Sequence, residues 1–355
     1  MKSLLTSPSL LVPSLLVAAF GIAACSSDTD SDPSPEATGG TATGGTSSTG
    51  GTAQGGTPTG TGGAPSNPTG NDLIGSFKVT LKAPTPTRVG YTEVLGSVYE
   101  RPYPEDTIWD VTRTEGLCTL TEPRVPFCDP VCTGGQICVE GGGCEPTPSK
   151  KSVGSVTVRG MHTASGANEF MLTAVGGTYQ PASDVGTLPY PGFDAGAPVT
   201  VSTSGGDFAP FTLEAPGIEP LEVTTAEPVR VAPNEPVPLA WDAPADPTTS
   251  KIEIKLEISH HGGVKGEITC NVPDSGSFTI PGSLVADLIA LGVAGFPTIG
   301  IVRLSTDEAA VSAGRVELLL VSAVEKGVSI PGLVSCNDVS ECEPGQECTQ
   351  ARKCE

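Results

Sequence analysis

The chain has 355 residues and a formal net charge of −21, with 40 acidic against 19 basic side chains. Such an acidic chain repels nucleic acid and anionic lipid surfaces, which argues against a nucleic-acid partner. Glycine and proline are abundant and aromatic residues make up only 5% of the chain. This composition favours β-structure with many turns and low-complexity segments over a helical enzyme.

Residues 1–24 have the pattern of a secretory signal peptide. Their apolar runs are too short to form a membrane-spanning helix. Residues 22–25, with the sequence Ile-Ala-Ala-Cys, resemble the bacterial lipobox. The resemblance implies cleavage before Cys25 and attachment of diacylglycerol and fatty acids such as palmitate at that cysteine, and several acyl chains hold a protein stably on a membrane. The alternative is an ordinary signal peptide followed by a chance cysteine.

Residues 25–71 are expected to form a disordered tether. Small polar and acidic residues fill positions 26–36, and positions 38–64 contain only Thr, Gly, Ala, Ser, Gln and Pro in an approximate Gly-Gly-Thr repeat. A segment of this composition has no apolar surface to bury. As a flexible coil it has a root-mean-square reach of roughly 40 Å, so it predicts a spacer between a membrane and a folded part.

Residues 72–205 predict a β-rich domain with a cysteine-rich insert at about 118–145. Alternation of polar and apolar residues, bounded by turn residues, indicates the strands. The expected strands are 77–81, 91–99, 156–158, 168–175 and 198–203. Tyr99, Tyr103 and Trp109 lie in a short proline-containing stretch. They form a possible aromatic platform for stacking on sugar rings, and the alternative is that they belong to the sandwich core and its turns.

Residues 206–332 predict a second β-sandwich domain. Residues 251–258 alternate charged and apolar side chains without a break, as a half-buried strand does. Further strands are expected at 219–224, 228–232, 237–242, 266–271, 299–304 and 314–322. Trp241, before a turn and the strand at 251, resembles the buried tryptophan of immunoglobulin-like and fibronectin-type sandwiches. The predicted fold class is therefore all-β, with antiparallel immunoglobulin- or fibronectin-like sandwich domains and two small disulfide-stapled modules.

One helix is expected in this second domain. Ser283 precedes the apolar run 284–291 and is predicted to cap it. The apolar character continues to Val302, but Asp287, two glycines and Pro297 interrupt it. We therefore expect a short helix followed by a buried strand, not a membrane span.

The cysteines predict disulfides, because ten remain after Cys25 and the compartment is an exported one. Two clusters share a Cys-x-x-Gly-Gln-x-Cys pattern, and the second forms a C-terminal module at residues 333–355. Four cysteines allow three pairings, of which we favour first-to-third and second-to-fourth. The leftover pair is expected to join Cys118 to Cys270. The clusters are Cys128, Cys132, Cys138 and Cys144, and Cys336, Cys342, Cys348 and Cys354.

No catalytic motif stands out in the sequence. There is no nucleophile elbow, phosphate-binding loop, zinc-protease motif or dinucleotide fingerprint. The cysteine spacings differ from zinc ribbons and knuckles, and His260-His261 reads as a solvated turn without a flanking carboxylate. We therefore expect no cofactor, no metal and no enzymatic activity. The abundant Asp and Glu residues leave a glycosidase-like carboxylate pair as an alternative, but no pair stands out.

The whole layout resembles myxobacterial-type surface lipoproteins of uncharacterised activity: a lipobox, a Thr/Gly-rich tether, a β-rich body and small Cys-Gly-Gln modules. The resemblance implies a lipid-anchored protein of the bacterial cell envelope and transfers no catalytic residue. By the sorting rule of enteric bacteria, Ser26 in place of Asp favours the outer membrane. The expected role is non-enzymatic, in interaction with a protein or glycan or in structure. A carbohydrate-binding surface module and an unrecognised hydrolase are the alternatives.

Overall fold

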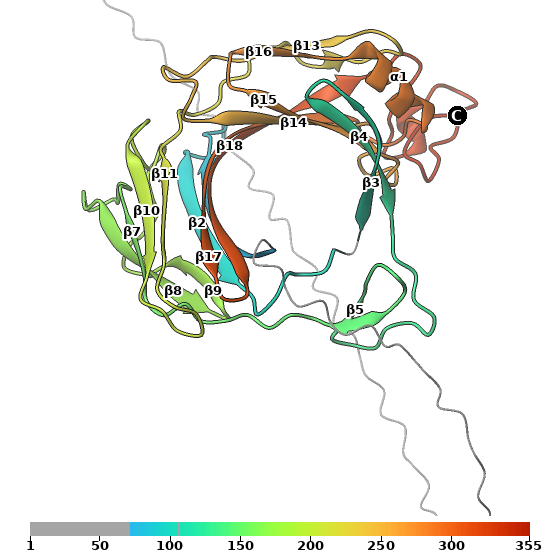
Figure 1. Cartoon of the computed structure of the whole chain (residues 1–355). Coiled ribbons are helices and arrows are strands. Elements are labelled where there is room, and N and C mark those ends of the chain that lie inside the picture. Colours follow the sequence, from blue (N-terminus) through green and yellow to red (C-terminus); the bar gives the residue numbers. More distant parts are fainter. Residues whose placement is uncertain (1–71, 106) are drawn as a thin grey trace, which may run out of the picture. The chain divides into compact units, whose positions relative to one another are not determined.

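The computed structural model describes residues 72–105 and 107–355, so the predicted signal peptide, the tether and Cys25 lie outside the described residues. Strands dominate this part of the chain (Figure 1). The strands are β1 (Leu73–Lys82), β2 (Tyr91–Val98), β3 (Ile108–Glu115), β4 (Cys118–Arg124), β5 (Gln136–Cys138), β6 (Cys144–Pro146), β7 (Val156–Arg159), β8 (Glu169–Val175), β9 (Thr178–Pro181), β10 (Pro198–Thr203), β11 (Thr212–Pro216), β12 (Val229–Arg230), β13 (Val237–Ala240), β14 (Lys251–Glu257), β15 (Glu267–Pro273), β16 (Ser277–Ile280), β17 (Thr298–Val311) and β18 (Gly314–Ser329). The helices are α1 (Gly282–Ala290) and the short 3₁₀ helix η1 (Val339–Glu341).

Fourteen of the strands belong to one sheet, in the order β11-β10-β7-β8-β9-β2-β1-β18-β17-β14-β15-β4-β3, with β12 pairing to β18 off this path. Most neighbours are antiparallel, but β1 runs parallel to β18, so that Phe77 lies opposite Leu318. The first and last long strands of the body are therefore neighbours in the middle of the sheet. The predicted all-β class with sandwich packing and two disulfide-stapled modules is confirmed.

The first hydrophobic core lies where one end of this sheet folds back on itself. Strands β1, β2 and β18 lie across from β7, β8, β10 and β11 (Figure 1). Apolar side chains of both groups form the core. Phe77 packs against Tyr179 with ring centroids 5.9 Å apart. The edge strand β11 comes up to β17, where the Glu214 backbone N–H donates to Asp307 Oδ2 at 2.7 Å. A side chain thus covers an edge that would otherwise present an unpaired N–H.

The second core lies between two layers. Strands β4, β15, β14 and β17 form one layer, and the separate β13–β16 sheet and α1 form the other. Ile252, Ile254 and Leu256 alternate into this core from β14, as the charged–apolar alternation predicts. Trp241 is buried in the same core, which confirms its expected place in the sandwich.

An ion pair lies buried at the margin of the second core. The side chains of Arg303 and Asp274 are 1% and 0% exposed, and Arg303 Nε donates to Asp274 Oδ2 at 2.6 Å. Trp241 Nε1 and Ser250 Oγ also donate to this carboxylate, at 2.8 and 2.7 Å. The guanidinium further donates to the backbone oxygens of Glu219, Pro220 and Asp242. The pair therefore joins β17, the turn after β15 and two loops, with its hydrogen-bonding groups satisfied.

Two local expectations are wrong. Residues 219–224 form no strand, because the carbonyls of Glu219 and Pro220 accept from Arg303 and only Val223 makes a bridge, to Trp241. The helix α1 exists, but Ser283 is not its cap: Pro281 holds that position, and Ser283 Oγ donates to Glu115 on β3 at 2.5 Å. None of the helices described could cross a membrane.

Residues from both sides of the predicted boundary at 205/206 share the first core, since Leu213, Ala215 and Ile218 belong to it. Conversely, Cys118 and Leu120 lie in the predicted first domain but belong to the second core. Both cores lie on the same continuous sheet. The domain limits drawn from the sequence stay predictions.

Candidate functional site

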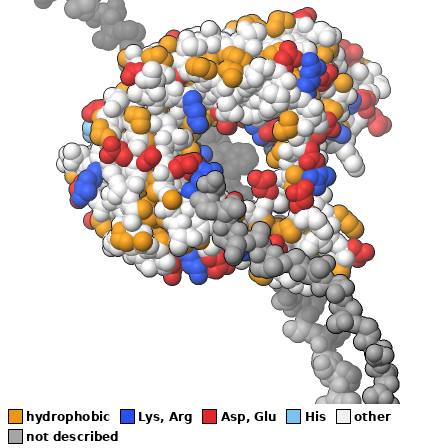
Figure 2. Space-filling view, viewed as in Figure 1, with side chains coloured by type: hydrophobic (Ala, Val, Ile, Leu, Met, Phe, Trp, Pro, Cys, Tyr) orange, Lys and Arg blue, Asp and Glu red, His pale blue; other side chains and the backbone are white. Residues whose placement is uncertain are grey.

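A broad sheet surface lies on the side opposite the two cores. It consists of the side chains of β2, β1, β18, β17, β14, β15, β4 and β3 that point away from the buried clusters, and we call it the inner face. On β14, for example, Lys251, Glu253, Lys255 and Glu257 alternate with the buried isoleucines and leucine. Figure 2 shows a hollow bordered by charged side chains at this place.

The inner face carries charges of both signs. Three ion pairs cross between neighbouring strands or along a hairpin: Lys82 with Glu93 at 3.6 Å, Lys255 with Glu267, and Arg315 with Glu308. By strand alternation its charged members are Lys78, Lys82, Lys251, Lys255, Arg315, Glu93, Glu253, Glu257, Glu267, Glu308, Glu317 and Glu325. The face also has an apolar part: Leu304 and Val321 lie opposite each other on β17 and β18, belong to neither core and are buried. The inner face therefore combines charged groups of both signs with a small apolar centre.

Glu308 and Glu317 form a carboxylate pair that sequence reasoning did not single out. They lie directly opposite each other on β17 and β18, where facing Cβ atoms are about 5 Å apart. Burial raises the pKa of Glu317, and the charge of Glu308 raises it further, while Arg315 and two lysines act in the opposite direction. The pair can be recognised only when the register of β17 and β18 is known. The sequence between the two strands does not fix the position of the hairpin turn, and therefore does not fix that register.

Replacing Glu317 with glutamine is expected to stabilise the protein at neutral pH by less than about 1 kcal/mol, since the group is partly exposed. The pKa of Glu317 is raised in the folded state. At pH values between its unfolded-state and folded-state pKa, the unfolded protein therefore binds fewer protons than the folded protein. Wild-type stability therefore falls as pH rises through that window. The difference between the proteins should vanish below about pH 4.3 and grow above it. Urea denaturation at a series of pH values measures this, and a difference that grew toward acid would contradict it.

The three aromatic residues of the possible glycan platform do not form one cluster. Tyr99 and Tyr103 meet edge to face, with ring centroids 5.4 Å apart, and Tyr103 is half exposed. Trp109 lies on β3, with the Lys255 ammonium 5.5 Å from its ring centroid. Among the described residues, no ring contact joins Trp109 to either tyrosine. A role of these residues in sugar binding stays a prediction.

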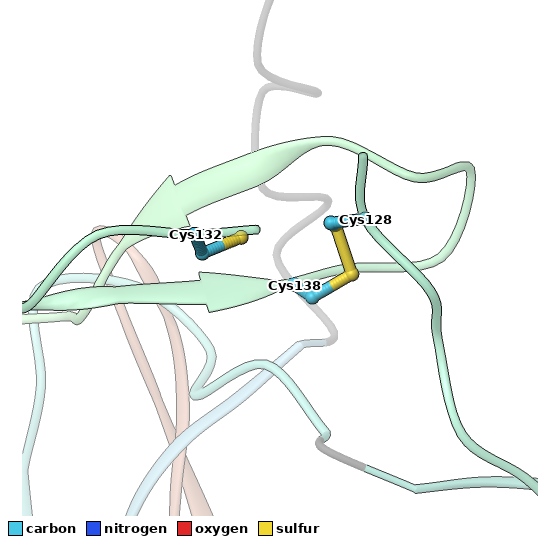
Figure 3. Close-up of side chains that lie close together, drawn as sticks. All are labelled: Cys128, Cys132 and Cys138. Carbon is cyan, nitrogen blue, oxygen red and sulfur yellow. A yellow bond between two sulfur atoms is a disulfide. The ribbon is translucent and has the colours of Figure 1, made fainter. Parts of the chain in front are cut away.

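All ten described cysteines are paired. Cys118 on β4 is bonded to Cys270 on β15, as expected from elimination. In both modules the first cysteine pairs with the third and the second with the fourth, which confirms the favoured connectivity. These bonds are Cys128–Cys138, Cys132–Cys144, Cys336–Cys348 and Cys342–Cys354. Figure 3 shows the bond between Cys128 and Cys138 beside Cys132. Sulfurs that are bonded to each other are not the free thiolates that zinc binds.

The shared Gly-Gln pair has a structural role in both modules. In the first module the Gln136 N–H donates to the Thr133 carbonyl at 3.1 Å, and the Gln136 side chain accepts from the Thr133 N–H at 3.2 Å. Gly135, between them, has φ 80°, where glycine is preferred. The second module repeats this turn between Glu343 and Gln346, at 3.0 and 3.2 Å. The two modules therefore share this turn as well as their disulfide pairing.

The histidines occupy two places. His162 Nε2 lies 3.2 Å from Asp194 Oδ1. His260 and His261 lie together in the turn after β14, with ring centroids 4.0 Å apart, and Glu257 Oε2 lies 3.6 Å from His260 Nδ1. The expectation that no carboxylate flanks the histidine pair is wrong, because the chain bends back after Ile258 and returns His260 to the last residue of the strand.

No protein-family model matches the chain, and no curated protein matches its sequence. Among solved structures, the crystal structure of chicken CNTN1 FN1-FN3 domains is similar at 7% identity, over 66% of this chain and 71% of that chain, with a TM-score of 0.16. A similarity of this size identifies neither a family nor an activity.

Proposed function

We propose that this chain is a lipid-anchored protein of the bacterial cell envelope, with a folded part that serves a non-enzymatic interaction or structural role. The observation that carries the proposal is the cysteine pairing. The sequence has eleven cysteines, and ten of them form five disulfides with one another. Disulfides persist in oxidising, exported compartments. Cys25 is the cysteine left over, and it is the one that ends the lipobox-like sequence.

A β-sandwich fold fits a non-enzymatic interaction or structural role. The inner face supports interaction, because it spans many strands and carries charges of both signs. The long hydrophilic segment before the body supports a position away from the membrane surface, and Ser26 supports the outer membrane. The partner that we propose is a protein or glycan of the envelope or its surroundings.

Replacing Cys25 with alanine is expected to abolish lipid attachment and release the protein from the membrane fraction. The body should remain folded, because Cys25 takes no part in the five disulfides. Labelling of cells with an alkyne analogue of palmitate, followed by fractionation and immunoblotting, measures both effects.

Ser27→Ala is the matched control, because it changes a neighbouring residue and leaves residues 22–25 intact. It should keep both the label and the membrane location. A Cys25→Ala protein that was still labelled and still sedimented with membranes would contradict the proposal.

A further inference from the structure

The turn after β14 brings two imidazoles together. Consecutive side chains on a strand point to opposite faces, but His261 has φ 62°, in the left-handed region, and the chain reverses there. The two rings therefore lie with centroids 4.0 Å apart and planes inclined by 55°. His261 is exposed, and the His260 side chain is 40% exposed.

A carboxylate completes the group. Glu257 Oε2 lies 3.6 Å from His260 Nδ1, and the Glu257 side chain is 22% exposed. Glu257 is opposite Glu267 on β15, but Glu267 is paired with Lys255. The Glu257 carboxylate therefore lies beside His260, whereas the charge of Glu267 is neutralised by Lys255.

The backbone holds this turn in place. The His260 carbonyl accepts from the Phe296 N–H at 2.8 Å, and the Ser259 carbonyl accepts from the Gly262 N–H at 2.8 Å. The neighbouring Gly295 N–H donates to the Ala351 carbonyl of the C-terminal module at 2.7 Å. The backbone that carries the two histidines is therefore held by hydrogen bonds. A ligand that binds their side chains loses less conformational entropy than it would on a flexible loop.

We propose that Glu257, His260 and His261 bind a divalent transition-metal ion such as Zn²⁺ or Cu²⁺, with water completing the coordination. Imidazole with carboxylate suits these ions, whereas Ca²⁺ and Mg²⁺ take oxygen ligands. The three donor atoms do not all lie within 4.8 Å of one another in this structure, so binding requires a rotamer change of the exposed His261 side chain. The site is independent of the lipid anchor and adds an ion-binding role to a chain whose sequence predicts none.

The test uses titration calorimetry with ZnCl₂ and CuCl₂ on the mature full-length chain carrying Cys25→Ala, purified without a histidine tag. The chain has three histidines, so His162→Ala is a matched control: His162 also lies beside a carboxylate, at 3.2 Å, but outside this turn. We expect one equivalent of bound ion in the parent and in His162→Ala. Binding should weaken at least about tenfold in Glu257→Gln, His260→Ala and His261→Asn. Asparagine is chosen at 261 because it tolerates positive φ.

Proton spectra of the three imidazoles give a second readout that needs no variant. Zn²⁺ should shift the signals of two histidines and leave the third unchanged. The proposal is overturned if millimolar Zn²⁺ and Cu²⁺ give no binding, or if affinity is the same in a His260→Ala/His261→Asn double variant that retains the parent's circular dichroism.

Discussion

Replacing Arg303 with methionine should lower the free energy of unfolding by about 3–5 kcal/mol, because it leaves the Asp274 carboxylate buried without its counter-charge. Asp274 is 0% exposed, and the remaining donors, Trp241 and Ser250, are neutral. The variant also removes the donors to three backbone carbonyls in the adjoining loops. Urea denaturation of the purified protein at neutral pH measures the loss.

Two further variants separate the buried charge from the packing. Arg303→Met/Asp274→Leu removes both charges, so it should recover part of the loss and show strong coupling in a double-mutant cycle. Arg230→Met removes an exposed pair with Glu235, at 3.3 Å and 62% and 56% exposed, and should change stability by at most about 1 kcal/mol. Equal effects at Arg303 and Arg230 would contradict a special role for the buried pair.

Replacing both Cys118 and Cys270 with alanine should destabilise the body by about 5 kcal/mol in the chain-entropy model. The bond spans a sequence separation of 152 residues, so its loss releases a very long loop in the unfolded state. Both side chains are also buried in the second core. The midpoint and slope of non-reducing urea denaturation give the change in free energy.

Cys342→Ala/Cys354→Ala is the comparison, because that bond spans only 12 residues. The chain-entropy model gives about 3 kcal/mol for so short a loop, and the effect should be confined to the C-terminal module. If the Cys118/Cys270 variant unfolded at the same urea concentration as the parent protein, the long bridge would have no stabilising role.

Several parts of this structure could be predicted because their signals are local. The alternation at 251–258 gives β14, and the buried Trp241 follows from its place beside the next turn. The repeated cysteine spacing gives two modules with the same pairing. In each case, the residues that make the prediction possible lie close together in the sequence.

The remaining parts depend on residues that are far apart in sequence. The parallel pairing of β1 with β18 has no local mark, and neither has the register that places Glu308 opposite Glu317. Arg303 interrupts an apolar strand, which signals a buried charge, but its partner Asp274 lies in a separate turn. The Glu257 carboxylate reaches His260 only because the chain reverses at the end of β14. Turn geometry and strand order decide these contacts.

The place of β1 sets an order for folding. A chain that is exported from its N-terminus delivers β1 first, but the neighbour on one side of β1 is β18, the last long strand. Until β18 is available, the edge of β1 that pairs with it has no native partner, and such long-range pairing is slow to form. If the chain is exported as proposed, the sheet can therefore be completed only after nearly the whole chain has been translocated, and until then the edge of β1 is open to pairing with other strands.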